Sequence, residues 1–264
     1  MPELPEVQVV VNGIIEKFLN KEIAEIIEIR PKTVQYFTEV EEFGKILDIE
    51  RRGKFILLFT DKKLKIVVHL RMTGKLISEE TEDYLPPHAR AYFVFKDKTR
   101  LIFDDARTFG KIQIYQQNAK IESIEKLGVE PLTDNFNEKY LKNILKNKKA
   151  PIKNLLLNQH LVAGLGNIYV AELLFRAKIS PKKEGGKLTS KEIVKIVKET
   201  KSVLQEAIKH NGTTISDYRS IYNKTGEFQN FLKVYQKKIC ECGNEISRIK
   251  QAGRSTYYCP KCQK

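Results

Sequence analysis

The chain has 264 residues and a mass of 30.6 kDa, which favours two domains with a small appendage. Lys and Arg total 47 against 33 Asp and Glu, so the net charge of +14 indicates a polyanionic partner, nucleic acid before an anionic membrane surface. A hydrophobic fraction of 41% excludes a wholly disordered chain, and no apolar run reaches the ~18 residues of a transmembrane helix. The chain opens without the basic and apolar regions of a signal peptide, so we expect a soluble, cytoplasmic protein with no membrane partner.

The first half of the chain changes from a helical to a strand-like pattern. Apolar residues at Val7, Val10, Val11, Ile14 and Phe18 share one helix face and predict a helix within the first 20 residues. Short β-branched or aromatic runs, separated by turn residues, follow this helix. The clearest runs are Phe55–Thr60, Leu64–Leu70, Ala91–Lys96, Arg100–Phe103 and Lys111–Gln116. Short strands with tight turns favour an antiparallel sandwich or barrel.

The second half is helical after a polar stretch, residues 118–137, that we interpret as a linker. The predicted helices cover Tyr140–Leu145, Asn154–Gln159, Ile168–Ala177 and, after the capping box Thr189–Glu192, Ile193–Ile208. The glycine turn Gly164–Asn167 separates the second and third helices and is typical of a helix–two-turn–helix motif. The third helix would then offer free backbone N–H groups to a phosphate, while an ordinary helical hairpin is the alternative.

All four cysteines lie within the last 25 residues of the chain. They are Cys240, Cys242, Cys259 and Cys262. Two close pairs separated by 16 residues indicate a metal site in a reducing compartment, and Cys₄ ligation favours one structural Zn²⁺. The polar segment 231–264 is too short to build its own core, so the metal would supply its stability. The first pair has C-x-C spacing, whereas the usual zinc finger has C-x₂-C.

The amino terminus offers a possible nucleophile. Pro2 follows Met1, and removal of that methionine would leave a secondary amine whose pKa is near ~7.7–8.0, so part of it is neutral at physiological pH. A neutral secondary amine can attack an acetal carbon and form a cationic iminium that acts as an electron sink. Glu3 and Glu6 could donate or shuttle protons beside it. The alternative is that these residues simply begin the first helix.

Six motifs occur in one order along the chain. They are Met1–Val7, Arg52–Phe55, Asp105–Gly110, Gly164–Tyr169, Phe228–Tyr235 and Gly253–Cys259. Together they resemble the formamidopyrimidine-DNA glycosylase family of bacterial base-excision repair enzymes, and the resemblance extends from residue 2 to residue 264. The opening Pro-Glu-Leu-Pro-Glu-Val is similar to that of the glycosylases for oxidised purines, whereas the sister enzyme, endonuclease VIII, typically opens Pro-Glu-Gly-Pro-Glu.

The resemblance implies chemical roles for four residues. Pro2 would be the Schiff-base nucleophile on C1′ of the damaged nucleotide, and Glu3 would protonate the sugar ring oxygen. Lys54 would serve β-elimination and contact a phosphate; a solvated surface lysine is the alternative. Arg254, at the tip of the cysteine hairpin, would hold phosphates that flank the lesion and assist δ-elimination.

The resemblance also implies DNA contacts. Met72 and Phe109 would fill the gap left by the flipped base, and Arg107 would face the orphaned cytosine; Phe109 would otherwise be placed in a core. Residues 216–227 match the loop that closes over the extruded base. Three further positions match phosphate contacts, namely His88, Lys148 and Asn167.

The sequence therefore predicts an α+β protein with four parts. An N-terminal helix plus antiparallel β-sandwich occupies residues 1–117, and a linker follows over 118–137. A helix–two-turn–helix domain covers 138–230, and a zinc β-hairpin finger covers 231–264. The resemblance implies a bifunctional glycosylase and AP lyase for oxidised purines.

The expected partner is damaged double-stranded DNA, lying in a basic cleft between the domains. We expect a monomer associated with the bacterial nucleoid. Two alternatives remain: an endonuclease VIII-like enzyme for oxidised pyrimidines, and a catalytically silent zinc protein that recognises lesions without cutting.

Overall fold

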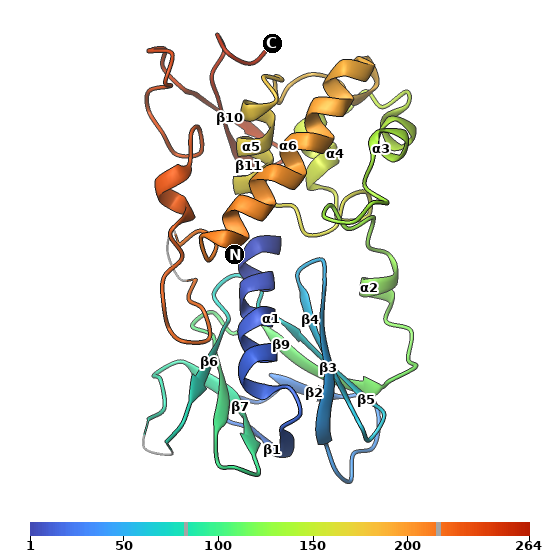
Figure 1. The fold of residues 1–264 in the computed structure, drawn as a ribbon, viewed down its shortest axis with the longest axis vertical. Helices are drawn as coiled ribbons and strands as arrows, with labels where there is room; N and C mark the ends of the chain where they lie inside the picture. Colours follow the sequence, from blue (N-terminus) through green and yellow to red (C-terminus); the bar gives the residue numbers. More distant parts are fainter. Residues whose placement is uncertain (82–83, 215–217) are drawn as a thin grey trace. The chain divides into compact units, whose positions relative to one another are not determined.

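A computed structural model of the chain describes residues 1–81, 84–214 and 218–264 (Figure 1). The chain forms two compact units, each built from two stretches of sequence. Unit 1 comprises residues 1–125 and 210–229, and unit 2 comprises residues 126–209 and 230–264. The structure thus groups residues 210–229 with the N-terminal sheet, whereas the sequence analysis places them in the helical domain.

Unit 1 combines helices with one large sheet. Its elements are α1 (Leu4–Phe18), β1 (Glu22–Glu28), β2 (Val34–Tyr36), β3 (Gly44–Arg52), β4 (Phe55–Thr60), β5 (Leu64–His69), β6 (Lys75–Glu79), β7 (Ala89–Phe95), β8 (Arg100–Asp104), β9 (Lys111–Gln116) and α2 (Glu122–Glu125). The strand order is β2-β9-β5-β4-β3-β1-β7-β8-β6. The five predicted strands are present; β1, β2, β3 and β6 had no comparable sequence signal.

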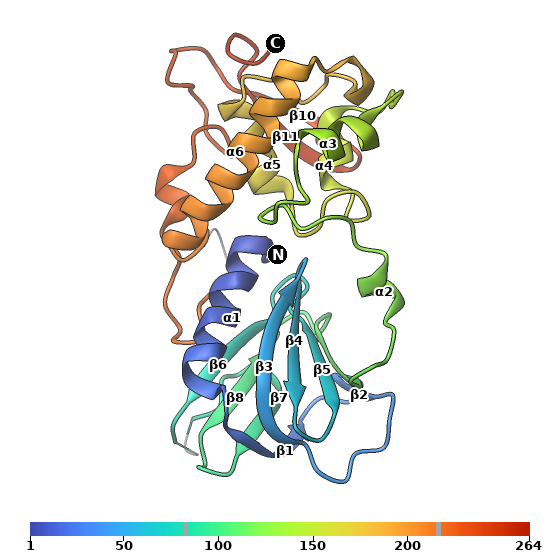
Figure 2. The same cartoon turned by 45° about the vertical axis from the view of Figure 1, so that its right-hand side comes forward.

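The sheet folds into two layers. β1 and β3 pair only at Glu22↔Lys45 and Ile23↔Gly44, so the sheet has two halves with a narrow junction. Figure 2 shows strands β3, β4 and β5 of one half and β6, β7 and β8 of the other. Buried side chains from both halves, such as Ile56 on β4 and Phe93 on β7, belong to one core. The predicted sandwich is therefore confirmed. Its pairing is antiparallel except for the parallel pair β2–β9.

Helix α1 closes this core along one side, as expected from its apolar stripe. Val10, Ile14 and Phe18 are fully buried in the same cluster as the sheet residues. The Phe18 ring stacks on Phe95 of β7, with the ring centroids 4.6 Å apart. This contact helps to fix the position of α1 on the sheet, because stacked aromatic rings prefer particular geometries and stabilise the fold beyond the area they bury.

The later stretch of unit 1 packs on the same helix. Ile221 is fully buried, and a Cβ added to Gly13 of α1 would lie 2.8 Å from Ile221 Cγ1. The backbone N–H of Ser78 on β6 donates to the Ile221 carbonyl over 2.8 Å. These contacts explain why residues 210–229 belong with the sandwich.

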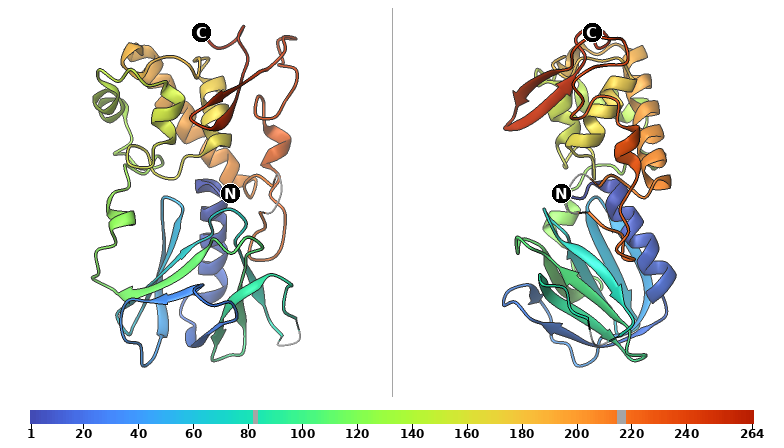
Figure 3. Two further views of the ribbon diagram at one scale, coloured as in Figure 1. Left: turned by 180° about the vertical axis from the view of Figure 1, so that it is seen from behind. Right: turned by 90° about the vertical axis from the view of Figure 1, so that its left-hand side faces the viewer.

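Unit 2 is mainly helical. Its elements are α3 (Glu138–Leu145), α4 (Ile152–Leu157), α5 (Asn167–Arg176), η1 (Gly185–Lys187), α6 (Ser190–Lys209), β10 (Ser247–Gln251) and β11 (Arg254–Tyr258), and η2 (Phe228–Phe231) lies at its junction with unit 1. Helix α5 contacts α4, α6 and β11, and Figure 3 shows the β10–β11 hairpin beside the helices. The predicted helices are confirmed, and α5 begins at Asn167 after Gly166 as the glycine turn indicates.

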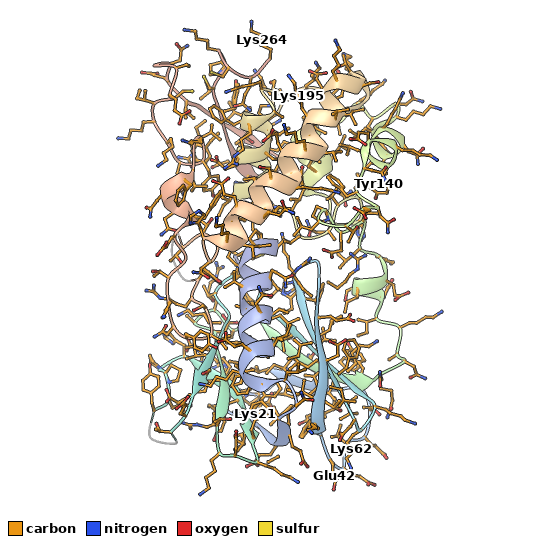
Figure 4. All side chains as sticks on the ribbon, viewed as in Figure 1. Lys21, Glu42, Lys62, Tyr140, Lys195 and Lys264 are labelled. Carbon is orange, nitrogen blue, oxygen red and sulfur yellow. The ribbon has the colours of Figure 1, made fainter. Side chains whose placement is uncertain are left out.

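Charged side chains cover the outer surface of each unit (Figure 4). Lys195 projects from α6, and Lys62 forms an ion pair with Glu42 over 2.5 Å between two strand turns. Across residues 1–81, 84–214 and 218–264, no helix combines the length and apolarity needed to cross a lipid bilayer.

Replacing Phe18 should test the packing of α1. Phe18→Ala removes a fully buried ring and its stack on Phe95, so the free energy of unfolding should fall by about 3–5 kcal/mol in urea denaturation. Ile15→Ala on the exposed side of α1 is the control and should change it by about 0.5 kcal/mol or less. Equal losses in the two variants would show that α1 is not held by this buried face.

Candidate functional site

The start of α1 is held by a buried carboxylate. Glu6 is 2% exposed; its Oε2 accepts the backbone N–H of Glu3 over 2.8 Å, and its Oε1 accepts that of Thr213 over 2.7 Å. The Glu3 side chain in turn accepts the Glu6 backbone N–H, which completes a capping box. Pro2 and Glu3 are also buried. Because both Glu6 oxygens accept hydrogen bonds, Glu6 anchors the amino terminus and is poorly suited to donate a proton.

The segment after α6 packs directly on this anchor. Gly212 has a φ of +77°, and a Cβ added there would lie 3.0 Å from Glu6 Oε1. Burial and, to a lesser extent, the charge of Glu6 raise the pKa of Tyr218. Part of the predicted base-covering loop, residues 216 and 217, lies outside the described residues. Its described part begins at Tyr218, which belongs to the core of unit 1.

Lys54 lies in the turn between β3 and β4 and is buried. The preceding Gly53 has a φ of +56°, a conformation that glycine adopts without steric cost. Arg51 donates from Nη1 to the Gly53 carbonyl and from Nε to Oε1 of Gln8 on α1, both over 2.9 Å. The turn that carries Lys54 is thus tied to the helix that begins beside Pro2.

A neutral imidazole lies near Lys54. His69 is the last residue of β5, and burial lowers its pKa to about 3, with smaller contributions from the charges of Arg71 and Lys54. The imidazole ring packs edge-on against Phe55, with the centroids 4.5 Å apart. His69 therefore stays uncharged at physiological pH and does not compete with Lys54 for an anion.

Two turns of the sandwich carry the three residues expected to probe DNA. Met72 follows β5 and is 39% exposed; Arg107 and Phe109 follow β8, and Phe109 is 51% exposed. Arg107 lies over the Phe109 ring, with Cζ 5.0 Å from the centroid. The hydroxyl of Thr73 joins the turns by donating to Asp105 Oδ1 over 2.5 Å. Exposed apolar and cationic side chains on two turns that are hydrogen-bonded to each other are suited to contact a polyanion with stacked bases.

Asp105 connects these turns, although the sequence analysis gave it no role. The residue is 1% exposed, and its Oδ2 accepts the Gly110 backbone N–H over 2.8 Å. Its own backbone N–H donates to the carbonyl of His88 over 2.9 Å, so a further predicted DNA-contacting residue adjoins the frame. The available sequence signal was an aspartate at the start of a turn that ends in glycine.

The tip of the β10–β11 hairpin is fastened to the helices of unit 2. Lys153 of α4 is 0% exposed and donates to the Ser255 carbonyl over 3.0 Å and to Thr256 Oγ1 over 2.6 Å. Asn167, the first residue of α5, donates from Nδ2 to the same Ser255 carbonyl over 3.0 Å. Arg254 is the adjacent residue and is exposed. The sequence analysis missed Lys153, because a buried lysine has no distinctive pattern.

The remaining predicted phosphate contact, Lys148, is exposed in the connection between α3 and α4. Gly186 donates its backbone N–H to the Lys148 carbonyl over 2.8 Å, which fixes the backbone of that connection. The Lys148 position is thus held by the loop before α6, a different support from the one that holds the hairpin tip.

A second buried carboxylate holds the chain that leads to the cysteines. Glu172 of α5 is fully buried and accepts three consecutive backbone N–H groups, from Lys233, Val234 and Tyr235, over 2.8–3.0 Å. Val234 shares a small core with Phe175 and two of the cysteines. The cysteine segment therefore has a fixed base on α5.

The four cysteines converge on one point. The Sγ atoms of Cys240, Cys242, Cys259 and Cys262 all lie within 4.8 Å of one another. The Cys240–Cys262 and Cys242–Cys259 Sγ distances are 3.9 and 3.6 Å. A tetrahedron with Zn–S bonds of about 2.3 Å has edges of about 3.8 Å, so the donors fit one structural Zn²⁺ despite the C-x-C spacing.

Family models match most of the chain. Residues 1–112 match the formamidopyrimidine-DNA glycosylase N-terminal domain, and residues 127–219 match the formamidopyrimidine-DNA glycosylase H2TH domain. Residues 241–264 match the zinc finger found in FPG and IleRS. This combination of sandwich, helix–two-turn–helix and zinc finger defines a class of DNA-repair glycosylases. The chain belongs to the formamidopyrimidine-DNA glycosylase family.

Relatives and solved structures align over the full chain. A formamidopyrimidine-DNA glycosylase of Wolbachia sp. subsp. Drosophila simulans (strain wRi) is 41% identical and covers 100% of both chains. One from Pelotomaculum thermopropionicum is 39% identical, covering 100% of this chain and 99% of the relative. The crystal structure of the MutM (FPG) protein from Thermus thermophilus has a TM-score of 0.90 at 35% identity, covering 99% of this chain and 98% of that one. A Lactococcus lactis Fpg complex with abasic-site DNA has a TM-score of 0.90 at 35% identity, covering 99% of each chain.

Loss of one zinc ligand should release the finger without unfolding the helices. In Cys262→Ser the bound zinc should fall from about one per chain to nearly none, and DNA affinity should fall at least about tenfold, because Arg254 depends on the hairpin. The α5 and α6 helices have their own buried contacts, so far-ultraviolet circular dichroism should change little. Metal analysis and a DNA-binding titration measure the two effects.

Lys261→Ser, at an exposed neighbouring position, is the matched control and should retain its zinc. A zinc-free native protein that binds lesion DNA with full affinity would contradict the role of the finger.

Proposed function

We propose that the protein is a bifunctional DNA glycosylase and AP lyase that excises oxidised purines from duplex DNA in base excision repair. The substrates are 8-oxoguanine and formamidopyrimidines. The observation that carries the proposal is the anchored amino terminus, where the buried Glu6 carboxylate accepts the backbone N–H groups of Glu3 and Thr213 at the start of α1. Such anchoring would preorganise a nucleophile at Pro2. Relatives named formamidopyrimidine-DNA glycosylase, and a Lactococcus lactis FPG variant solved with Fapy-dG DNA, support the substrate class.

The first step uses Pro2. After loss of Met1, its neutral secondary amine attacks C1′ of the damaged nucleotide, and the bond from C1′ to the base breaks. The base leaves with the bonding electrons and takes up a proton, while the Pro2 nitrogen, cationic after its attack, releases the proton it carried. Glu3 protonates the sugar ring oxygen, which opens the ring and gives an iminium between Pro2 and C1′. Glu3 is buried beside Pro2 at the start of α1, which places its carboxyl group next to the nucleophile.

The iminium then drives strand cleavage by two eliminations. Removal of a proton from C2′ expels the 3′ phosphate, and a second elimination expels the 5′ phosphate. Lys54 and Arg254 contact phosphates and support the eliminations. The product is a one-nucleotide gap with phosphates on both sides.

DNA recognition uses residues of both units, which are exposed apart from the half-buried Asn167. Met72 and Phe109 fill the gap in the base stack, and Arg107 faces the orphaned cytosine. His88, Lys148 and Asn167 contact phosphates, with the Asn167 amide shared with the hairpin carbonyl it already holds. The net charge of +14 also favours DNA binding, because cationic side chains that neutralise phosphates release the counterions condensed on the DNA. The enzyme acts as a monomer associated with the bacterial nucleoid.

Oxidised pyrimidines are a second candidate substrate class. The wild-type Lactococcus lactis FPG has been solved with DNA containing an oxidised pyrimidine, which favours some tolerance in the same fold. An excision panel with 8-oxoguanine and oxidised pyrimidines in matched duplexes ranks the two classes.

Borohydride trapping tests the nucleophile. Reduction of the reaction on 8-oxoguanine or abasic duplex should yield a covalent protein–DNA adduct, and peptide mapping should place it on Pro2, because only an imine is reduced to a stable amine. Pro2→Ala should lower excision at least about 100-fold, since a positioned nucleophile is lost. A trapped lysine in a fully active Pro2→Ala enzyme would overturn the assignment. If the mass of the native protein shows that Met1 has been removed and no adduct forms, the result favours the silent lesion-binding alternative.

Arg107 should set the preference for the opposite base. Its planar donor fork can reach O2 and N3 of cytosine, whereas adenine presents an N6 donor on the corresponding edge. Excision of 8-oxoguanine should be faster opposite cytosine than opposite adenine, and Arg107→Ala should reduce that ratio by about tenfold, equivalent to one good contact of about 1.4 kcal/mol. Single-turnover rates on the two duplexes give the ratio. An unchanged ratio in the variant would exclude this role.

A further inference from the structure

The turns after β5 and β8 share one buried acceptor. Asp105 Oδ1 accepts from the Thr73 hydroxyl over 2.5 Å and from the Arg107 backbone N–H over 3.2 Å, while Oδ2 accepts from the Gly110 backbone N–H over 2.8 Å. The Arg107 N–H also donates to Thr73 Oγ1 over 3.1 Å, which closes a small triangle between the turns. Thr73 and Arg107, which this last hydrogen bond joins, are 34 residues apart in sequence.

The backbone of Asp105 extends this frame. Its carbonyl accepts from Nε of Arg90 over 2.7 Å, and its N–H donates to the His88 carbonyl over 2.9 Å. Three separate segments, one with Met72, one with His88 and one with Arg107, therefore meet at a single residue.

Both turns need external support. Arg71 has a φ of +55° and Thr108 a φ of +59°, and neither residue is a glycine. Side chains with a Cβ adopt this left-handed conformation at a steric cost, so the surrounding contacts must hold it. A buried, acceptor-only carboxylate is an effective brace, because it is itself costly to leave without donors.

We infer that Asp105, through its hydrogen bond with Thr73, is a positioning residue that makes the Met72 turn and the Arg107–Phe109 turn into one rigid reading element. The inference rests on the proposed function, because it assigns these exposed side chains to DNA. The wedge that fills the base stack and the cation that faces the orphaned base are thereby placed together. Insertion of Met72 and Phe109 into the base stack is thereby coupled to the contact of Arg107 with the orphaned base.

The test separates base extrusion from strand cleavage. Thr73→Val keeps the side-chain shape and removes the hydroxyl donor. Asp105→Asn replaces one acceptor oxygen with an NH₂ donor. In one orientation the NH₂ group faces the Gly110 N–H; in the other it faces the Thr73 hydroxyl and the Arg107 N–H. Single-turnover excision of 8-oxoguanine opposite cytosine should fall about 10- to 100-fold in each variant, the size expected from a misplacement of about 1 Å. The cytosine-to-adenine preference should shrink in the same variants.

Cleavage at a preformed abasic site should change by less than about threefold, because no base needs to be unstacked there. Thr73→Ser restores the hydroxyl and should restore excision. The double variant Thr73→Val/Asp105→Asn should lose no more than the worse single variant, because both changes break one link.

Asp61→Asn is the matched control. Asp61 also accepts a backbone N–H from a neighbouring segment, that of Lys45 over 2.9 Å, but its turn lies at the opposite end of β5 from Met72. This variant should excise 8-oxoguanine at the wild-type rate. Thermal unfolding of every variant shows whether it is folded, and Thr73→Val keeps the test available if Asp105→Asn fails to fold.

Two results would overturn the inference while the wild type remains active. One is full excision activity in folded Thr73→Val. The other is an equal loss on lesion and abasic DNA in both Thr73→Val and Asp105→Asn, which would mark a general structural defect. A wild type that neither excises the base nor forms a borohydride adduct would instead refute the proposed function.

Discussion

A carboxylate withdrawn from water must find hydrogen-bond donors, and this requirement organises the functional parts of the chain. Glu6, Asp105 and Glu172 are almost fully buried, and each accepts backbone N–H groups from a neighbouring segment. Glu6 fixes the amino terminus, Asp105 fixes two turns of the sandwich, and Glu172 fixes the chain before the cysteines. Backbone donors cannot rotate away as side chains can, so each carboxylate sets the path of a whole segment.

This arrangement separates the groups that hold the structure from those that are free to touch a ligand. The carboxylates are internal, whereas Met72, Phe109 and Arg254 are exposed on the turns beside them. A charged partner can thus be bound by residues that contribute little to the cores. The buried Lys153 follows the same logic with the opposite charge, since it holds the hairpin carbonyl beside the exposed Arg254.

Periodic and motif-based features of the sequence were sufficient for the main elements. The apolar stripe of α1, the capping box of α6 and five of the strands depend on local patterns, and the structure contains them. These strands are β4, β5, β7, β8 and β9. The short edge strand β2 and the parallel pairing with β9 depend on tertiary contacts, which no local pattern records. The grouping of residues 210–229 with the sandwich was also missed, because the packing of Ile221 on Gly13 joins distant positions.

The candidate site shows the same division between local and distant information. The convergence of the four cysteines followed from their spacing and is present in the structure. The bracing residues Asp105, Lys153 and Glu172 were missed as a group. A buried charged residue looks like any surface charge in sequence, and its role appears only when its donors or acceptors come from elsewhere in the chain.

Because unit 1 is built from two separate stretches of sequence, it cannot finish folding until the second stretch has been synthesised. Residues 1–125 emerge first, yet the partners that complete the unit are synthesised about 100 residues later, after roughly 5 to 20 s at about 5 to 20 residues per second. These partners are Thr213 for Glu6 and Ile221 for Gly13. During that interval the surface of α1 at Gly13 lacks the cover of Ile221, and Glu6 lacks the N–H donor of Thr213. The amino terminus therefore gains its final setting only after most of unit 2 has left the exit tunnel.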